Sequence, residues 1–265
     1  MDTKHQFLHS LTKPYLVKRY LVSTLFFIGS VFSVSVSAAL ILNPSSPITE
    51  VVNIQAIVVS DDDGTNTAEF FGNSTQSAII EGFIDDIWAQ AGIDINFLSA
   101  NSWDNSFANN GSGLPTDTRP TSDLRTIVSD GSNAGVASAD ATVINMYFVN
   151  IAAGFSLLGE NNAAGLGFVG GNGITQYVGS NLLDFTGGQE VIAGVVSHEI
   201  GHNLGLGHIT EFENLMDTGG QRLNSTQIST ALASDFSVAV VPVPPALVLF
   251  LSGLGLLGFC RRKRA

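Results

Sequence analysis

The residues most suited to chemistry lie in one eleven-residue window, from His198 to His208. This window holds three of the five histidines of the chain, and the other two lie within the first ten residues. Because a helix turns about 100° per residue, His198 and His202 share one helical face, from which both imidazoles can reach one metal ion. Glu199 lies on the flank of that face. It can therefore hold a metal-bound water without being a ligand itself.

A third ligand is expected from the chain just after this helix. Gly205 follows His202, at the place where the helix must end if His208 is to approach the same metal. Glycine tolerates the left-handed backbone that such an ending requires. Three neutral imidazoles leave one position of a tetrahedral zinc ion open, as in catalytic sites. The expected chemistry is hydrolysis, in which zinc activates a water and polarises a carbonyl while Glu199 takes the proton of the water.

The segments before this window predict a sheet with a helical crossover. Residues 51–60 are rich in β-branched side chains and indicate a strand. Apolar residues recur at helical spacing over 80–91, and Gly92 marks the end of that helix. Residues 93–97 alternate between apolar and polar types, which predicts a second strand. Strand, helix and strand in this order favour a right-handed crossover between parallel neighbours.

The segments that follow vary in composition. Residues 101–138 are rich in Asn, Ser, Gly and Asp, which predicts a long surface excursion with a short structured piece at 124–128. Residues 141–151 are apolar on both faces and indicate a buried strand. The apolar piece 166–169 lies within a glycine-rich region and predicts an edge strand. The helix that carries the histidines is expected over 187–206.

The pattern His-Glu-x-x-His-x-x-Gly-x-x-His resembles that of the metzincin metallopeptidases. Met216, within the sequence Asn-Leu-Met-Asp, matches the methionine of their Met-turn, which forms an apolar floor under the histidines. The resemblance implies a twisted, mixed five-stranded α/β (α+β) sheet with one antiparallel edge strand at 166–169. This sheet would pack on the first long helix and the active-site helix, with a last helix near 224–234.

The resemblance also implies a function for each residue of the motif. His198, His202 and His208 would bind one catalytic zinc ion, Glu199 would be the general base, and Gly205 would form the structural turn. The expected protein is a zinc-dependent endopeptidase acting on a peptide or protein substrate. Ile209 follows the third histidine, where better-known subfamilies carry other residue types, so the subfamily stays open.

Two alternatives concern the use of metal. The first is a non-catalytic, zinc-containing surface or biofilm-matrix protein that binds glycans or partners. The second is an additional calcium site, because Asp61, Asp63 and Asn66 bring several oxygens together around Gly64. A solvated turn is the favoured interpretation of that segment, since no bidentate glutamate stands at the required spacing. Trp88 is expected in the core, and Trp103 in a small apolar cluster under a loop.

The charge of the chain excludes a nucleic-acid-binding function. The net charge is -12, and all but one of the 23 acidic residues lie between the two ends of the chain. Only three bases lie in the same middle region, namely Arg119, Arg125 and Arg222. Three scattered arginines cannot form the cationic surface that a phosphate backbone needs. The single cysteine, Cys260, leaves no intramolecular disulfide.

Both ends of the chain resemble sorting signals. Residues 1–38 are basic, then apolar, and end in small residues, which predicts a secretory signal peptide. Residues 238–265 contain a proline-rich piece, an apolar run over 246–260 and the basic cluster Arg-Arg-Lys-Arg. This order resembles the PEP-CTERM signal of Gram-negative bacteria, which is handled by an exosortase.

The domain between them is expected over 39–237. The resemblance predicts export across the inner membrane to the cell envelope, the cell surface or the medium, with transient or permanent membrane association through a transmembrane tail. Cleavage specificity, latency, tail processing and oligomeric state are left open by the sequence.

Overall fold

The computed structural model describes residues 40–111, 123–150, 164–217 and 220–240, all within one compact unit that spans residues 37–265. The predicted signal peptide and the apolar run over 246–260 lie outside the described residues, so both stay predictions. Among the helices that are described, none combines the length and the apolar character needed to cross a bilayer.

The first three elements form the predicted crossover. Strand β1 (Glu50–Ser60) is followed by helix α1 (Ser74–Ala89) and strand β2 (Ile93–Asp104), and the two strands pair in parallel. Asn73 caps α1, because its side chain accepts hydrogen bonds from the exposed N–H groups of the first turn. Gly92 turns the chain towards β2 with a φ of 70°, a left-handed conformation that favours glycine.

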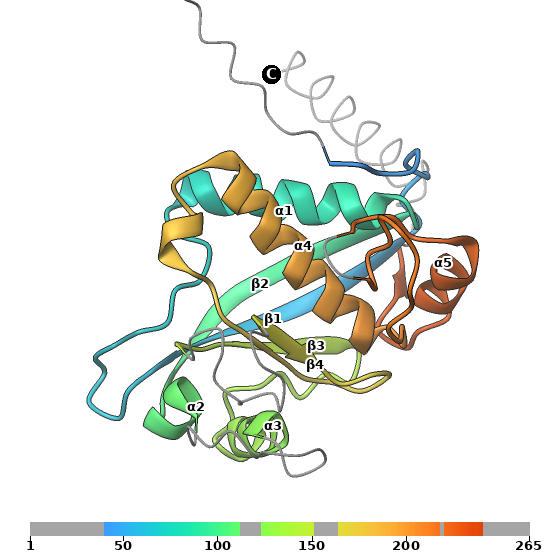
Figure 1. Cartoon of the computed structure of the whole chain (residues 1–265). Helices are drawn as coiled ribbons and strands as arrows, with labels where there is room; N and C mark the ends of the chain where they lie inside the picture. The colour runs from blue at the N-terminus through green and yellow to red at the C-terminus, as the bar shows by residue number, and fades with distance from the viewer. Residues whose placement is uncertain (1–39, 112–122, 151–163, 218–219, 241–265) are drawn as a thin grey trace, which may run out of the picture. The chain divides into compact units, whose positions relative to one another are not determined.

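The strands form a mixed sheet in the order β2-β1-β3-β5-β4 (Figure 1). Strand β3 (Val143–Phe148) pairs in parallel with β1 and with β5 (Ile174–Gln176), while β4 (Gly165–Gly167) is antiparallel to β5 at the edge. The predicted five strands with one antiparallel edge strand are thereby confirmed. The short strand β6 (Val238–Ala239) adds an antiparallel pairing to the start of β1, two residues beyond the expected end of the domain.

Part of the predicted surface excursion is regular structure instead. Strand β2 continues to Asp104, and helices α2 (Ser106–Asn110) and α3 (Asp123–Asn133) follow. The sequence of α3 is polar on average and contains Gly131, so its intrinsic helix propensity is low, although its apolar residues fall on one face. Its helix is stabilised by packing, because Leu124 and Ile127 are buried against the sheet.

Apolar clusters cover both faces of the sheet. Helices α1 and α4 (Thr186–Asn203) pack together over one face, and α2 and α3 lie on the other (Figure 1). Along β3, Met146 belongs to the first cluster and Tyr147 to the second, as the alternation of a strand requires. Trp88 is fully buried in the first cluster, and Trp103 stacks edge-on against Tyr147 in the second, so both tryptophan predictions are confirmed.

Two short helices complete the elements that surround the site. The 3-10 turn η2 (Ser180–Leu182) leads into α4, and α5 (Ser225–Leu232) follows the segment that contains Met216. The helices predicted over 187–206 and 224–234 are therefore present with slightly shorter bounds.

Candidate metal centre and catalytic cleft

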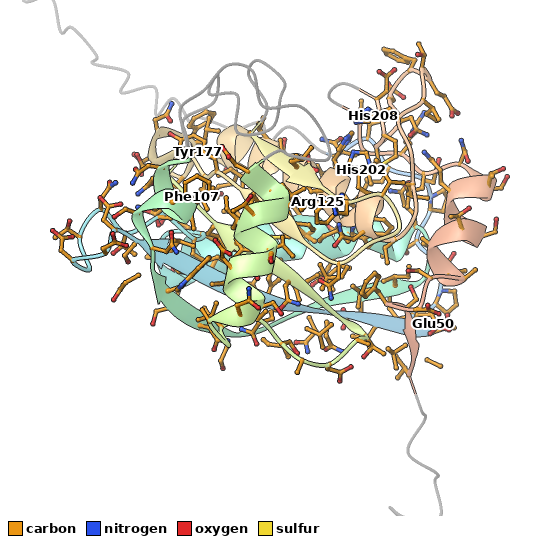
Figure 2. The ribbon with its side chains drawn as sticks, turned by 90° about the horizontal axis from the view of Figure 1, so that it is seen from below. Glu50, Phe107, Arg125, Tyr177, His202 and His208 are labelled. Atoms are coloured by element: carbon orange, nitrogen blue, oxygen red, sulfur yellow. The ribbon has the colours of Figure 1, made fainter. Side chains whose placement is uncertain are left out.

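The three histidines of the motif converge at the end of α4. The Nε2 atom of His208 lies 3.1 Å from Nε2 of His198 and 3.1 Å from Nε2 of His202. Figure 2 shows His202 and His208 close together. A tetrahedral zinc ion with ordinary zinc–nitrogen bonds holds its ligand atoms about 3.3 Å apart. The spacing of the three nitrogens therefore fits one shared zinc ion.

The backbone around the histidines leaves their Nε2 atoms available as ligands. Nδ1 of His198 lies 2.7 Å from the carbonyl of Leu215, and Nδ1 of His202 lies 2.8 Å from that of Leu206. A carbonyl only accepts, so Nδ1 must carry the proton and donate in both pairs. The Nε2 lone pairs then point at the shared position. Second-sphere bonds of this kind orient metal-binding histidines and fix their tautomer.

Burial makes the neutral form of His198 more favourable. It lowers the pKa of His198, although the hydrogen bond to Leu215 opposes this, and the nearby His208 lowers it further. By solvent exposure His198 is partly buried, His202 is buried and His208 is exposed. A neutral imidazole is the form that binds a metal ion.

The end of α4 has the turn that the position of Gly205 predicts. Its φ is 95°. The N–H of Gly205 donates to the carbonyl of His202, and the N–H of Leu206 donates to that of Gly201. This pair of bonds is a Schellman motif, which ends a helix at a left-handed glycine. The turn sends the chain back so that His208 meets the two helical histidines.

Met216 lies under the histidine helix as a Met-turn would place it. The Met216 side chain is fully buried. The backbone carbonyl of Met216 accepts a hydrogen bond from the N–H of Ile209 at 3.2 Å. A Cβ atom added to Gly201 would lie 2.8 Å from the sulfur of Met216. Gly201 is therefore required for the close contact between α4 and this turn. The sequence pattern did not identify this glycine.

An amide pair holds the Met-turn against α5. Asn214 and Gln227, both buried, exchange two hydrogen bonds of 2.9 Å between their side chains. Asn214 Oδ1 also accepts the N–H of Met216, at 2.9 Å. The position of Met216 thus depends on two amide side chains that carry no motif signal.

The carboxylate of Glu199 lies between α4 and the edge strand. It is 6% exposed, and a Cβ atom at Gly165 would lie 2.6 Å from its Cγ atom. At Gly167 a Cβ atom would lie 2.8 Å from the carbonyl of Glu199. Asn203 donates to the carbonyls of Phe168 and Gly173, which ties the β4–β5 hairpin to the helix. The glycines of β4 therefore let the edge strand approach the catalytic residues.

The comparison with protein families agrees with this geometry. Residues 113–209 match the model of the reprolysin-like metallopeptidases of family M12B. The site is that of a metzincin-type zinc metallopeptidase. A comparison of this chain with curated proteins found no match.

Solved archaemetzincins are similar in structure to the metallopeptidase. That of Methanopyrus kandleri covers 69% of this chain and 87% of its own, with 15% identity and a TM-score of 0.38. That of Archaeoglobus fulgidus, solved with malonate, covers 67% and 91%, with 15% identity and a TM-score of 0.36.

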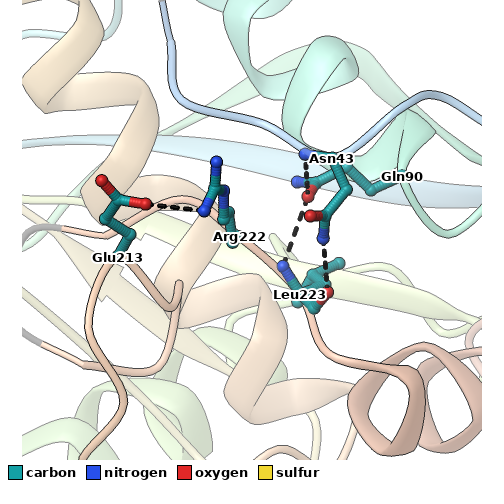
Figure 3. Close-up of polar contacts among 5 residues, drawn as sticks. All are labelled: Asn43, Gln90, Glu213, Arg222 and Leu223. Atoms are coloured by element: carbon teal, nitrogen blue, oxygen red, sulfur yellow. Dashed lines mark hydrogen bonds and ion pairs between the residues drawn. The ribbon is translucent and has the colours of Figure 1, made fainter.

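A cavity of about 630 Å³ opens beside the histidines of the metallopeptidase. Its lining comes from α4, from β4 with Ala164, and from the Met-turn with the segment Gly220–Gln221, which is called the far wall below. Gln90, at the end of α1, accepts from Leu223 N–H at 3.3 Å and donates to the carbonyl of Gln221 at 2.8 Å. Figure 3 shows Gln90 between Leu223 and Asn43. This residue of the first helix therefore fixes the far wall of the cleft.

An ion pair supports the same wall. Arg222 contacts Glu213 at 2.7 Å (Figure 3), and its backbone pairs with the chain before Met216. Leu215 N–H donates to the carbonyl of Arg222 at 2.7 Å. The segment after the Met-turn is therefore fastened both to the Met-turn and to α1.

The aspartates considered for calcium are engaged with protein donors. Asp61 accepts hydrogen bonds from Asn109 and Asn110, which lower the pKa of Asp61. Asp63 accepts two from Thr65. Within the described ranges, the one cluster of three or more metal-binding side chains is the histidine triad. These contacts support a hydrogen-bonded turn at residues 61–66.

Proposed function

We propose that this metallopeptidase is an exported endopeptidase that hydrolyses peptide bonds with Glu199 as general base. The observation that carries the proposal is the convergence of three Nε2 atoms beside an open cleft, with a buried carboxylate one residue after the first ligand.

Each residue of the site has a role in this proposal. His198, His202 and His208 would hold the zinc ion, which supplies an activated water and polarises the substrate carbonyl. Glu199 would accept a proton from the attacking water and pass it to the leaving amine. Strand β4, at the edge of the sheet, offers its backbone to an extended peptide. Backbone N–H groups there would assist in stabilising the developing oxyanion.

The first test replaces Glu199 with glutamine in the full-length protein. Glu199→Gln keeps the packing against Gly165 and removes the proton acceptor. We expect zinc to remain bound at one ion per chain while casein cleavage falls by about 10²- to 10⁴-fold. Elemental analysis and a cleavage assay measure both quantities. Asp235→Asn removes one exposed carboxylate away from the cleft and serves as the control.

The results separate the enzyme from the alternative function. Cleavage that is sensitive to chelators and lost only in Glu199→Gln supports the proposal. Zinc in both proteins without cleavage of casein or of a broad peptide library would favour the non-catalytic zinc protein. An absence of zinc from both would contradict the three-histidine site itself.

We further propose that the enzyme acts in the cell envelope or outside the cell. The support is the predicted signal peptide, the PEP-CTERM-like tail and the shortage of bases in the middle of the chain. Fractionation of a Gram-negative host, with mass spectrometry of both termini, tests the location. An uncleaved N-terminus in the cytoplasmic fraction would contradict it.

A further inference from the structure

One acidic residue of the cleft has no role in the hydrolysis described above. Glu190 lies on α4 two turns before His198, and Gly194 lies between them. Positions four residues apart share one face of a helix. All three residues line the same cavity. A stripe of the active-site helix therefore runs along the cleft from the metal ligands to a carboxylate.

The side chain of Glu190 is largely shielded from solvent, and one oxygen of its carboxylate has no protein partner among the described residues. The residue is only 8% exposed, and its Oε1 atom has no hydrogen-bond partner among the described residues. Burial raises the pKa of Glu190. A buried, unpaired carboxylate is costly unless a cation or a donor reaches it.

The charges of the cleft favour a cationic occupant. Its lining includes the further acids Glu199 and Asp217, and no lysine or arginine is among the described lining residues. A zinc ion on the three histidines would offset the acids beside it, so the negative charge that is left lies at the Glu190 end of the cleft and attracts a ligand of opposite sign there. The bound group expected beside Glu190 is therefore positive.

Between the metal ligands and Glu190, the missing side chain of Gly194 leaves this side of α4 open up to the side chain of Gln221. Among the described residues, Nε2 of Gln221 is the one atom within 4 Å of a Cβ atom added to Gly194, at 3.9 Å. Eight residues of helix span about 12 Å along the axis. Only a long side chain held near the histidines extends far enough along this path. Gln90 donates to the carbonyl of Gln221 and so holds the backbone of this lining residue in place.

We propose that the cleft selects a substrate with a lysine or arginine next to the scissile bond, whose charged end pairs with Glu190. This inference rests on the proposed peptidase function. Arginine is the favoured residue, because its planar guanidinium binds a carboxylate through two parallel hydrogen bonds. Glu190 would determine specificity without taking part in the proton transfer by Glu199.

The test compares peptides that differ by one charge. Peptides with arginine or with its neutral isostere citrulline beside the cleaved bond are given to the full-length enzyme. We expect kcat/KM to be on the order of 10- to 100-fold higher for arginine in the wild type. The preference should fall below about 3-fold in Glu190→Gln. Asp184→Asn, which removes an exposed carboxylate outside the cavity, should keep the wild-type preference.

A second variant closes the path without touching the charge. Gly194→Leu places a side chain between His198 and Glu190. It should abolish the arginine preference in kcat/KM, while elemental analysis still finds one zinc ion per chain. An arginine preference that survives both Glu190→Gln and Gly194→Leu would overturn the inference.

Failure of this inference can be distinguished from failure of the proposed function. Cleavage by the wild type without preference for arginine contradicts the role of Glu190 alone. If the wild type cleaves nothing, the peptidase proposal fails. Calorimetry of the same peptides on Glu199→Gln then tests the pairing, since arginine should bind more tightly than citrulline only when Glu190 is present.

Discussion

At the scale of residues, the amides around the site do as much positioning as the motif does. Gln90 and Asn203 each bond backbone groups of segments far away in the sequence, and Asn214 joins the N–H of Met216 to the side chain of Gln227. An amide suits this task because it carries both a donor and an acceptor. Metal ligands follow from local spacing, whereas these bridges depend on distant pairs. For that reason the sequence predicted the ligands and missed the amides.

The amide pair beneath the Met-turn is expected to be strongly coupled. Asn214→Ala leaves the Gln227 amide and the N–H of Met216 buried without their partner, which should lower the free energy of unfolding by about 2–3 kcal/mol. Gln227→Ala should cost a similar amount for the same reason. Urea denaturation of both single variants and of the double variant gives the coupling energy. Strictly additive losses would show that the two side chains act independently.

At the scale of elements, the sequence identified the segments that have a clear apolar pattern, on one face or on both. Helix α1 and strands β1 and β3 have such patterns and were predicted. Strand β5 lacks such a pattern, because it is three buried residues in a glycine-rich stretch. Helix α3 was predicted only as a short structured piece, because its polar sequence and Gly131 lower its helix propensity. Their structure comes from packing and pairing with distant segments, a contribution that a local pattern does not contain. The glycines of β4 could be recognised in the sequence, but the sequence did not predict their contact with Glu199.

The contact between α1 and the outer strand β2 predicts a dependence of stability on pH. Asp85 accepts the N–H of Ile95 at 3.2 Å, and burial raises the pKa of Asp85 to about 6, with further raising by Asp94, Glu81 and Asp86. The folded state thus holds this proton more tightly than the unfolded state does, so stability contributed by the protonated group is lost as the pH rises from about 4 to about 6.

Replacing Asp85 with asparagine should remove that loss. Asp85→Asn keeps an acceptor for Ile95 and should be about 1 kcal/mol more stable than the wild type at pH 7, after discounting for partial exposure, and equal to it near pH 4. Urea denaturation at several pH values measures this. Asp86→Asn, on the exposed side of the same helix, should increase the free energy of unfolding at pH 7 by less than Asp85→Asn does. A parallel pH profile for wild type and Asp85→Asn would contradict the assignment.

At the scale of the whole molecule, the site joins parts that the sheet alone does not hold together. The histidines belong to α4 and to the chain after it, the floor belongs to the Met-turn, and Gln90 of the first helix fixes the far wall. A metal bound by both sides of the Gly205 turn therefore links the active-site helix to the C-terminal part of the domain. Loss of the ion should therefore lower the stability of the domain and not only change the geometry of the site.

Zinc is accordingly expected to stabilise the fold. At zinc concentrations about 100-fold above Kd, binding to the native state contributes about 2.7 kcal/mol. For a domain of this size that shifts Tm by roughly 5–10 °C. Differential scanning calorimetry with a chelator, followed by added zinc, should show a fall and a recovery of Tm in the wild type. His208→Ala removes the exposed ligand with little loss of packing, so its Tm should respond weakly to either treatment. A Tm of the zinc-loaded wild type that is unchanged by complete removal of the metal would show that the histidines are held together without it.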